Sequence, residues 1–126
     1  MALYATEFDR SVKHRVVYDD SCTTTVNSDA SGGPCVLKSI IIDNTAGSGI
    51  NYVRCANGRG STIGADEIRV SVPCPGRVKR TIQFPDGVPF ERGLSFWCSG
   101  NTNPVSNTAP NLTSNTAKIV VTLVLG

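Results

Sequence analysis

The sequence predicts an all-β protein, a single antiparallel β-sandwich of the jelly-roll or immunoglobulin-like kind. Three observations lead to this prediction. Short runs rich in Val, Ile, Thr and aromatic residues recur between clusters of Gly, Pro, Asn and Ser. No segment keeps a helical periodicity over three turns. The 126 residues have the common size of one domain, which can bury a core without the help of a metal or a disulfide.

Seven segments have the composition of strands. They are 12–18, 36–43, 50–55, 67–72, 77–84, 94–98 and 118–125. In the segment 77–84, alternation places Val78, Ile82 and Phe84 on one side of the pleat and polar residues on the other. Arg80 falls on the apolar side, so its side chain must reach an edge of the sheet or pair with a carboxylate.

Two strands are apolar on both sides. The runs "SIIIDN" (39–44) and "KIVVTLVLG" (118–126) show no alternation, which is typical of strands buried on both faces. Either loops or another subunit must cover the second face. Val120 and Val124 are therefore predicted to lie in a protein interface.

The connections between strands carry turn residues. In "DNTAGSGIN", a hairpin loop, Asn44, Gly47 and Gly49 are expected to supply positive φ angles. The two prolines of "VPCPG" (72–76) are expected to break the sheet. The run "FPDGVPFERG" (84–93) places an Asp-Gly turn between two prolines.

Two segments lack a strand pattern. Residues 101–116 form a long loop rich in Asn, Thr, Ser and Pro, with Val105 and Leu112 as its apolar anchors. Loops of this length are usually binding elements or mobile, so both residues are predicted interface residues. Residues 1–35 are predicted to be an N-terminal arm or edge segment that reaches a neighbouring molecule. Residues 36–126 then form the sandwich domain.

The segment "PFERGLSFWCSG" (89–100) holds the only tryptophan. On a strand, Leu94, Phe96 and Cys98 share the core face, and Trp97 lies between serines on the opposite face. Tryptophan is enriched where subunits meet. Trp97 is therefore predicted to anchor a neighbouring loop or subunit, and Cys98 to be a small core residue rather than a nucleophile.

The chain has five cysteines, no Cys-x-x-Cys pair and a single histidine, so no zinc-finger spacing can be assembled. We expect free, buried thiols in a reducing cytosol. The alternative is a disulfide that forms later, and Cys22 and Cys35 are its expected partners because they flank a flexible loop. No metal or cofactor is expected.

Charge and hydropathy exclude several classes of protein. The net charge is +2, and twelve Lys and Arg residues are scattered along the chain, so no direct nucleic-acid binding is expected. The longest apolar run is too short to span a membrane. The N-terminus shows no targeting signal, and synthesis and retention in the cytoplasm are expected.

Catalysis is not expected. Acidic residues such as Asp19 and Asp20 are sequence neighbours, whose side chains diverge on an extended chain. The one histidine, His14, stands in no motif with a cysteine. The glycine-rich run "NGRGSTIG" (57–64) lacks the lysine and the helix of a phosphate-binding loop.

Two runs resemble small structural proteins of tailed bacteriophages. "LKSIIIDNTAGSGINYVRCAN" (37–57) is similar to the opening hairpin of these proteins, and "VPCPGRVKRTIQFPDGVPFERGLSFWCSG" (72–100) is similar to its continuation. Together the two runs cover about half of the chain. The N-terminal segment and the cysteines are not part of the resemblance.

The resemblance implies a structural protein of the virion that acts through contacts and not through catalysis. The main expectation is a capsid decoration (cement) protein, a homo-oligomer, with a trimer favoured, on the major capsid protein of the head surface. A neck, tail or baseplate protein is the alternative. A carbohydrate-binding module is a third possibility, although exposed aromatic clusters are not evident in the sequence.

Overall fold

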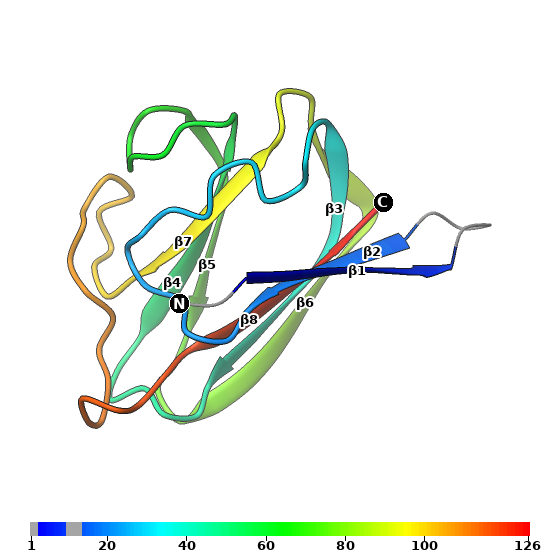
Figure 1. Cartoon of the computed structure of the whole chain (residues 1–126). Coiled ribbons are helices and arrows are strands. Elements are labelled where there is room, and N and C mark those ends of the chain that lie inside the picture. The colour runs from blue at the N-terminus through cyan, green and yellow to red at the C-terminus, as the bar shows by residue number, and fades with distance from the viewer. Residues whose placement is uncertain (1–2, 10–13) are drawn as a thin grey trace.

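The computed structural model describes residues 3–9 and 14–126, with side chains from Arg15 onward (Figure 1). These residues contain no helix, and they confirm the prediction of an all-β sandwich. The described strands are β1 (Leu3–Asp9), β2 (His14–Asp19), β3 (Cys35–Asn44), β4 (Asn51–Asn57), β5 (Glu67–Cys74), β6 (Val78–Phe90), β7 (Leu94–Ser99) and β8 (Val120–Leu125).

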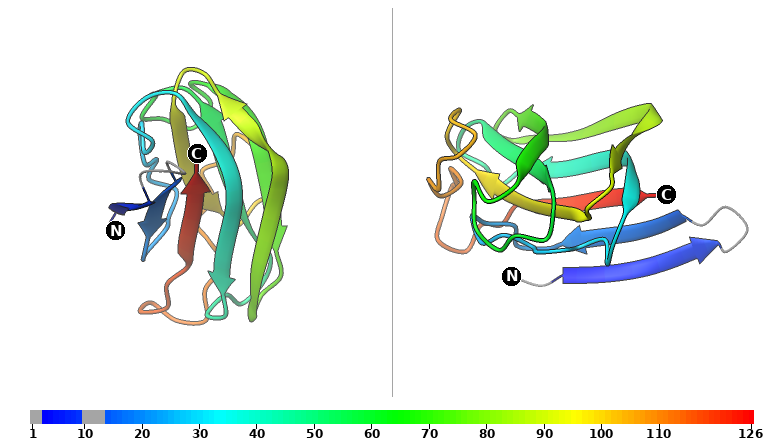
Figure 2. Two further views of the ribbon diagram at one scale, coloured as in Figure 1. Left: turned by 90° about the vertical axis from the view of Figure 1, so that its right-hand side faces the viewer. Right: turned by 90° about the horizontal axis from the view of Figure 1, so that it is seen from above.

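The strands form two packed sheets in which every described pairing is antiparallel (Figure 2). One sheet has the order β1-β2-β8-β3-β6, and the other has the order β5-β4-β7. The segment 22–31 runs beside β7 as an irregular fourth strand. Asn27 N donates to Phe96 O at 2.9 Å, and Cys98 N donates to Thr23 O at 2.9 Å. With this segment counted as a strand, the order is that of a jelly roll.

The core lies between the sheets and contains side chains that alternate along each strand. β8 contributes Val121, Leu123 and Leu125, and β7 contributes Leu94, Phe96 and Cys98, as its alternation predicts. Burial of each large apolar side chain stabilises the fold by about 1.5–3 kcal/mol. The other large core residues are Val17, Leu37, Ile40, Ile42, Val53, Phe90 and Ile119.

The expected arm of residues 1–35 is only partly separate from the sandwich. β1 is an edge strand that pairs with β2 alone in the described sheet. β2 pairs with β8 as well, and Val17 on β2 is completely buried. Residues 14–19 therefore belong to the five-stranded sheet, near its edge. The division of the chain at residue 35 stays a prediction. Residues 12 and 13 of the expected strand 12–18 lie outside the described residues.

Of the two expected breaks in the sheets, one is wrong and the other is confirmed only in part. β6 continues through the Asp-Gly pair to Phe90, and its register with β3 passes from Gln83–Ser39 to Val88–Leu37 across a bulge. Gly87 has a positive φ of 74°, which lets the backbone form this bulge and not a hairpin turn. The chain does leave the sheet at Pro75, between the end of β5 at Cys74 and the start of β6 at Val78. Pro73 does not break it, because β5 is an edge strand, where a proline is tolerated.

The expected positive φ angles at Asn44, Gly47 and Gly49 are also wrong. None of the three lies in the left-handed region. Position 47 instead needs a glycine because the side chain of Asn44 packs directly against its backbone, and a Cβ atom there would collide with that side chain. Arg80 behaves as expected: its side chain is exposed at the sheet edge, and its Nη1 donates to Pro73 O at 2.7 Å.

Candidate interaction surfaces

The structure places the predicted interface residues in different parts of the molecule. Trp97 is only 1% exposed, whereas Val105 is 60% exposed on the β7–β8 loop. Leu112, on the same loop, packs against the core and forms a β-bridge with Gly47. Val120 and Val124 lie together on the outer face of the five-stranded sheet. The structure therefore offers two surfaces, a sheet face and a loop end.

The outer face of the five-stranded sheet is defined here by Val16, Ile41, Val120, Thr122 and Val124, all half-buried. Alternation along β8 sends these side chains away from the core, because the residues between them point inward. Val124 pairs with Val16 on β2 and with Ser39 on β3, and Thr122 pairs with Ile41. Figure 2 (left) shows that no described loop crosses this face.

The β6 side of this face is polar. Lys79 pairs with Asp43 in the ladder, and Thr81 pairs with Ile41. Lys79, Thr81 and Gln83 are exposed. An apolar centre with a polar margin is the usual composition of a protein interface.

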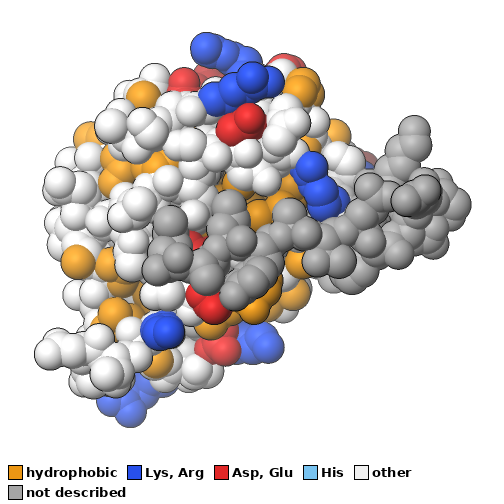
Figure 3. Space-filling view, viewed as in Figure 1, with side chains coloured by type: hydrophobic (Ala, Val, Ile, Leu, Met, Phe, Trp, Pro, Cys, Tyr) orange, Lys and Arg blue, Asp and Glu red, His pale blue; other side chains and the backbone are white. Residues whose placement is uncertain are grey.

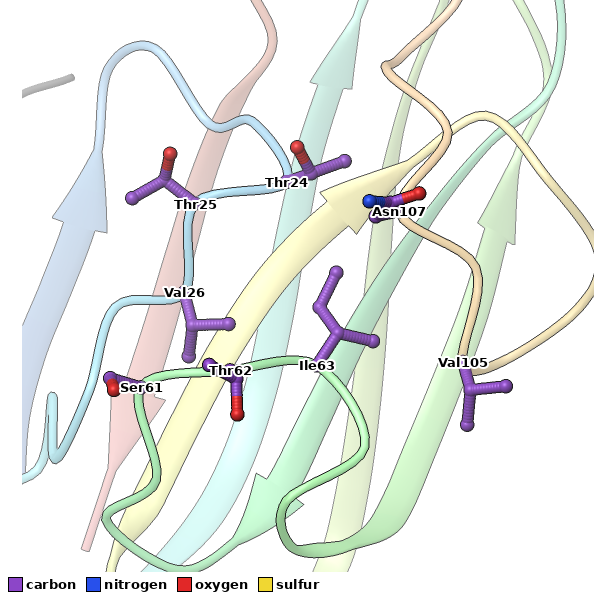
Figure 4. A pocket seen from close by; sticks show the side chains of 8 residues that line it. All are labelled: Thr24, Thr25, Val26, Ser61, Thr62, Ile63, Val105 and Asn107. Atoms are coloured by element: carbon purple, nitrogen blue, oxygen red, sulfur yellow. The ribbon is translucent and has the colours of Figure 1, made fainter.

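The loop end contains an open groove of about 650 Å³ between three connections (Figure 4). Thr24 and Val26 come from the connection after β2, Thr62 and Ile63 from the β4–β5 loop, and Asn107 from the β7–β8 loop. The remaining lining residues are Thr25, Ser61 and Val105. None of the lining side chains is ionisable. In Figure 3 this part of the surface, at the left, carries mainly uncharged atoms, with charged side chains toward its upper and lower margins.

Arg54 lies under the start of the β7–β8 loop and is 0% exposed. Its Nε donates to Ser71 Oγ at 3.1 Å, and its Nη2 donates to Asn101 O at 2.7 Å and to Thr102 O at 3.1 Å. The guanidinium carbon lies 4.8 Å from the ring centroid of Tyr52. Burial lowers the pKa of Arg54. Alternation along β4 alone would leave this arginine in solvent, so its burial was not predicted from the sequence.

Trp97 is the cross-strand partner of Arg54 and shares its face of the three-stranded sheet. The prediction that Trp97 lies on the face opposite the core residues of β7 matches the register. The surrounding chain nevertheless buries the indole, so Trp97 presents no surface to a second subunit. Its serine neighbours Ser95 and Ser99 are buried as well. The expected contact of Trp97 with a neighbouring loop of the same chain agrees with this burial, and the expected contact with a second subunit does not.

All five cysteines, each in the described part of the chain, are free and buried. Cys22 and Cys35, the expected disulfide partners, are not bonded to each other. A hydrogen bond with Cys98 and burial raise the pKa of Cys22 well above its usual value. Burial also strongly raises the pKa of Cys55. Thiols of this kind are poor nucleophiles at neutral pH, because the reactive form is the thiolate.

The described residues contain neither a cluster of metal ligands nor a helix that could span a membrane. No group of three or more His, Cys, Asp and Glu side chains is arranged to hold a metal ion. No helix is long and apolar enough to cross a membrane. No protein-family model, curated protein or solved structure matches the chain.

Proposed function

We propose that this protein is a structural component of a tailed-bacteriophage virion, a capsid decoration protein that binds the head surface through protein–protein contacts and catalyses no reaction. The observation that carries the proposal is the outer face of the five-stranded sheet. Its apolar side chains, Ile41, Val120 and Val124 among them, are half-buried and lie under no described loop.

A second copy of the chain is the proposed occupant of this face. Apolar side chains of the adjacent strands β2, β8 and β3 lie together there, and polar side chains of β6 border them on one side. Closed homo-oligomers are the common form of soluble assemblies, and we propose a trimer because capsids offer local three-fold positions. A stable contact of ordinary size would bury about 1,600 Å² in total.

The loop end is the proposed contact with the major capsid protein. Val105, the most exposed large apolar side chain in the described residues, lines a groove that combines hydroxyl and amide groups with apolar side chains. An uncharged surface with apolar side chains at Val26, Ile63 and Val105 suits a contact that must hold against internal pressure at high salt, since screening does not weaken it.

The resemblance to phage structural proteins supports the virion location. Its two runs, 37–57 and 72–100, contain most of β3, all of β4, the end of β5, and all of β6 and β7. The jelly-roll order adds weak support, because this fold is frequent in capsid proteins and also in lectins. A fold alone does not define a function, so the proposal depends on the binding experiment below.

The experiment adds purified protein to expanded phage heads that lack decoration and counts the bound copies after sedimentation. We expect saturable binding to heads and no binding to tails. Val105→Asp should reduce the binding to heads at least tenfold. The control Val78→Asp changes another exposed valine, at the start of β6, and should bind normally. Binding to tails or necks alone would contradict decoration in favour of the alternative location.

Self-association is tested separately by measuring the mass of the purified chain in solution. We expect an oligomer, and Val124→Lys should dissociate it because a charge then enters the centre of the outer face. The long lysine stem can reach solvent from this half-buried position, so the fold should persist. Val78→Lys is the matched control. A monomeric wild-type chain would contradict the proposed use of this face.

A further inference from the structure

Two buried polar side-chain atoms in the described residues have no protein hydrogen-bond partner: Arg54 Nη1 and Trp97 Nε1. They belong to residues that pair directly across β4 and β7. Directly opposed side chains on one face of a sheet lie within reach of each other. Native structures satisfy almost all of their buried polar groups, so two unsatisfied donors at neighbouring positions need a common explanation.

The charge of Arg54 has no carboxylate partner among the described residues, and the ring of Tyr52, 4.8 Å from the guanidinium carbon, compensates it only in part. The groups that accept its hydrogen bonds are the hydroxyl of Ser71 and the carbonyls of Asn101 and Thr102, all neutral. By contrast, the exposed Arg69 pairs with Glu67 and Glu91 at 2.7 Å each. An arginine stays protonated even when buried, because its pKa is far above neutrality. A buried, unpaired charge of this kind is strongly unfavourable.

The chemistry of these two donors determines which kind of ligand can accept their hydrogen bonds. Nη1 of Arg54 offers two N–H groups and the indole of Trp97 offers one, and neither atom can accept a hydrogen bond. The occupant must therefore be an acceptor, and a negative charge would also neutralise Arg54. Both residues are at most 1% exposed, so the occupant must be small.

We propose that Arg54 Nη1, with Trp97 Nε1 as the second donor, forms a buried binding site for a small monovalent anion of the size of chloride. The site lies on the outward face of the three-stranded sheet, beneath the first residues of the β7–β8 loop.

The anion has a consequence for the loop end. Arg54 holds the loop through the carbonyls of Asn101 and Thr102, and the same loop continues to Val105 and Asn107 in the groove. An anion that fixes the guanidinium therefore also fixes one wall of the groove. Because only the folded chain contains the site, chloride must stabilise the fold by mass action.

The test uses Trp97 as an internal probe, since it is the only tryptophan. The full chain is titrated with sodium chloride against sodium gluconate at constant ionic strength. We expect a saturable change in tryptophan emission and a Tm that rises with chloride. Bromide should replace chloride and quench the emission at the same site with saturation. Identical Tm values in the two salts, with no saturable change in emission, would overturn the proposal.

Variants separate a bound anion from a general salt effect. Arg54→Gln keeps an amide donor but removes the charge, and the chloride dependence of Tm should disappear. Arg69→Gln removes an exposed charge and should leave that dependence intact. If Arg54→Gln fails to fold, Trp97→Phe keeps an aromatic ring and removes the indole N–H together with part of the bicyclic ring system. Its chloride affinity, from the Tm series, should be about tenfold weaker. Unchanged affinity in Trp97→Phe and unchanged dependence in any folded Arg54→Gln would contradict the assigned donors.

Discussion

Asn51 Nδ2 donates a hydrogen bond of 2.9 Å to Asn44 Oδ1, and both side chains are completely buried at one end of the sandwich. Asn44 Nδ2 donates to the carbonyls of Cys74 and Pro75 at 2.9 Å each. Asn51 Oδ1 accepts from the backbone N–H of Asn111 at 2.7 Å. The pair therefore joins the β3–β4 turn, the β5–β6 turn and the long β7–β8 loop.

We expect Asn44→Ala to destabilise the protein by about 2–4 kcal/mol, because it leaves several buried backbone carbonyls and the amide of Asn51 without partners. Urea unfolding measures this loss. The control Asn107→Ala removes an exposed asparagine in the groove and should change the free energy of unfolding by less than about 0.5 kcal/mol. Equal effects of the two substitutions would show that the buried pair does not hold the turns together.

The β5–β6 turn approaches the β3–β4 turn so closely that Gly76 admits no side chain. A Cβ atom at Gly76 would lie 2.8 Å from Gly49 N and 2.9 Å from Gly47 O. Both contacts are with backbone atoms, so the turns would have to separate. We expect Gly76→Ala to destabilise the fold by about 1–3 kcal/mol in thermal or urea unfolding.

Gly49→Ala is the matched control in the adjacent turn. A Cβ atom there would meet only the side chain of Asn111, at 3.8 Å, which is an ordinary contact, and its φ is not left-handed. The substitution should be neutral or slightly stabilising, because alanine restricts the unfolded chain. A loss at Gly49→Ala as large as at Gly76→Ala would mean that glycine flexibility, and not close approach, is what this region requires.

The thiols give a prediction about oxidation state. Because all five cysteines are free and buried, iodoacetamide should not label the native protein at neutral pH. In urea without reductant, the mass should increase by five carbamidomethyl groups. An increase of only three would reveal a disulfide. Peptide mapping would then distinguish Cys22–Cys35 from Cys22–Cys98, whose thiols are in contact in this structure.

Local alternation could predict the β7 faces, because residues i and i+2 of a strand always share a face. It could not predict what covers each face. Arg54, the cross-strand partner of Trp97, is buried because the loop after β7 folds back over the sheet, and that contact joins residues distant in sequence. The signal that sequence reasoning missed was an arginine in the middle of an apolar strand, "YVRCA", which reads as exposed unless a loop covers it.

Pairing between strands distant in sequence also determines two features of the fold that local sequence patterns do not show. The Asp-Gly pair in 84–93 has the composition of a hairpin turn, but pairing with β3 on both sides keeps β6 continuous. Residues 14–19 of the expected arm or edge segment join the five-stranded sheet because β2 gains its partner, β8, from the other end of the chain. Such pairings depend on the whole fold and leave no local pattern.

Asp43, beside the asparagine pair, gives the protein a defined response to acid. Its Oδ1 accepts hydrogen bonds from Thr45 Oγ1 at 2.6 Å and from Thr45 N at 3.1 Å. These bonds, the side-chain one first, lower the pKa of Asp43, and Lys79 adds a smaller effect in the same direction against the opposing effect of burial. The folded-state pKa is therefore below the unfolded value of about 3.9. It follows that ionised Asp43 stabilises the fold above the unfolded pKa, and that this contribution is lost as the pH falls through the folded pKa.

Thr45→Val tests this linkage because it removes the hydroxyl donor and keeps the backbone N–H. The pKa of Asp43, measured by NMR titration of its carboxyl carbon, should rise toward the unfolded value. The variant should be less stable than the wild type at neutral pH, and this difference should shrink as the pH falls below the folded pKa, where Asp43 is protonated in both proteins. Thr62→Val, an exposed threonine in the groove, should leave the titration of Asp43 unchanged. An unshifted pKa in Thr45→Val would show that the hydroxyl does not hold the carboxylate in its ionised form, and the acid response would then have to come from another group.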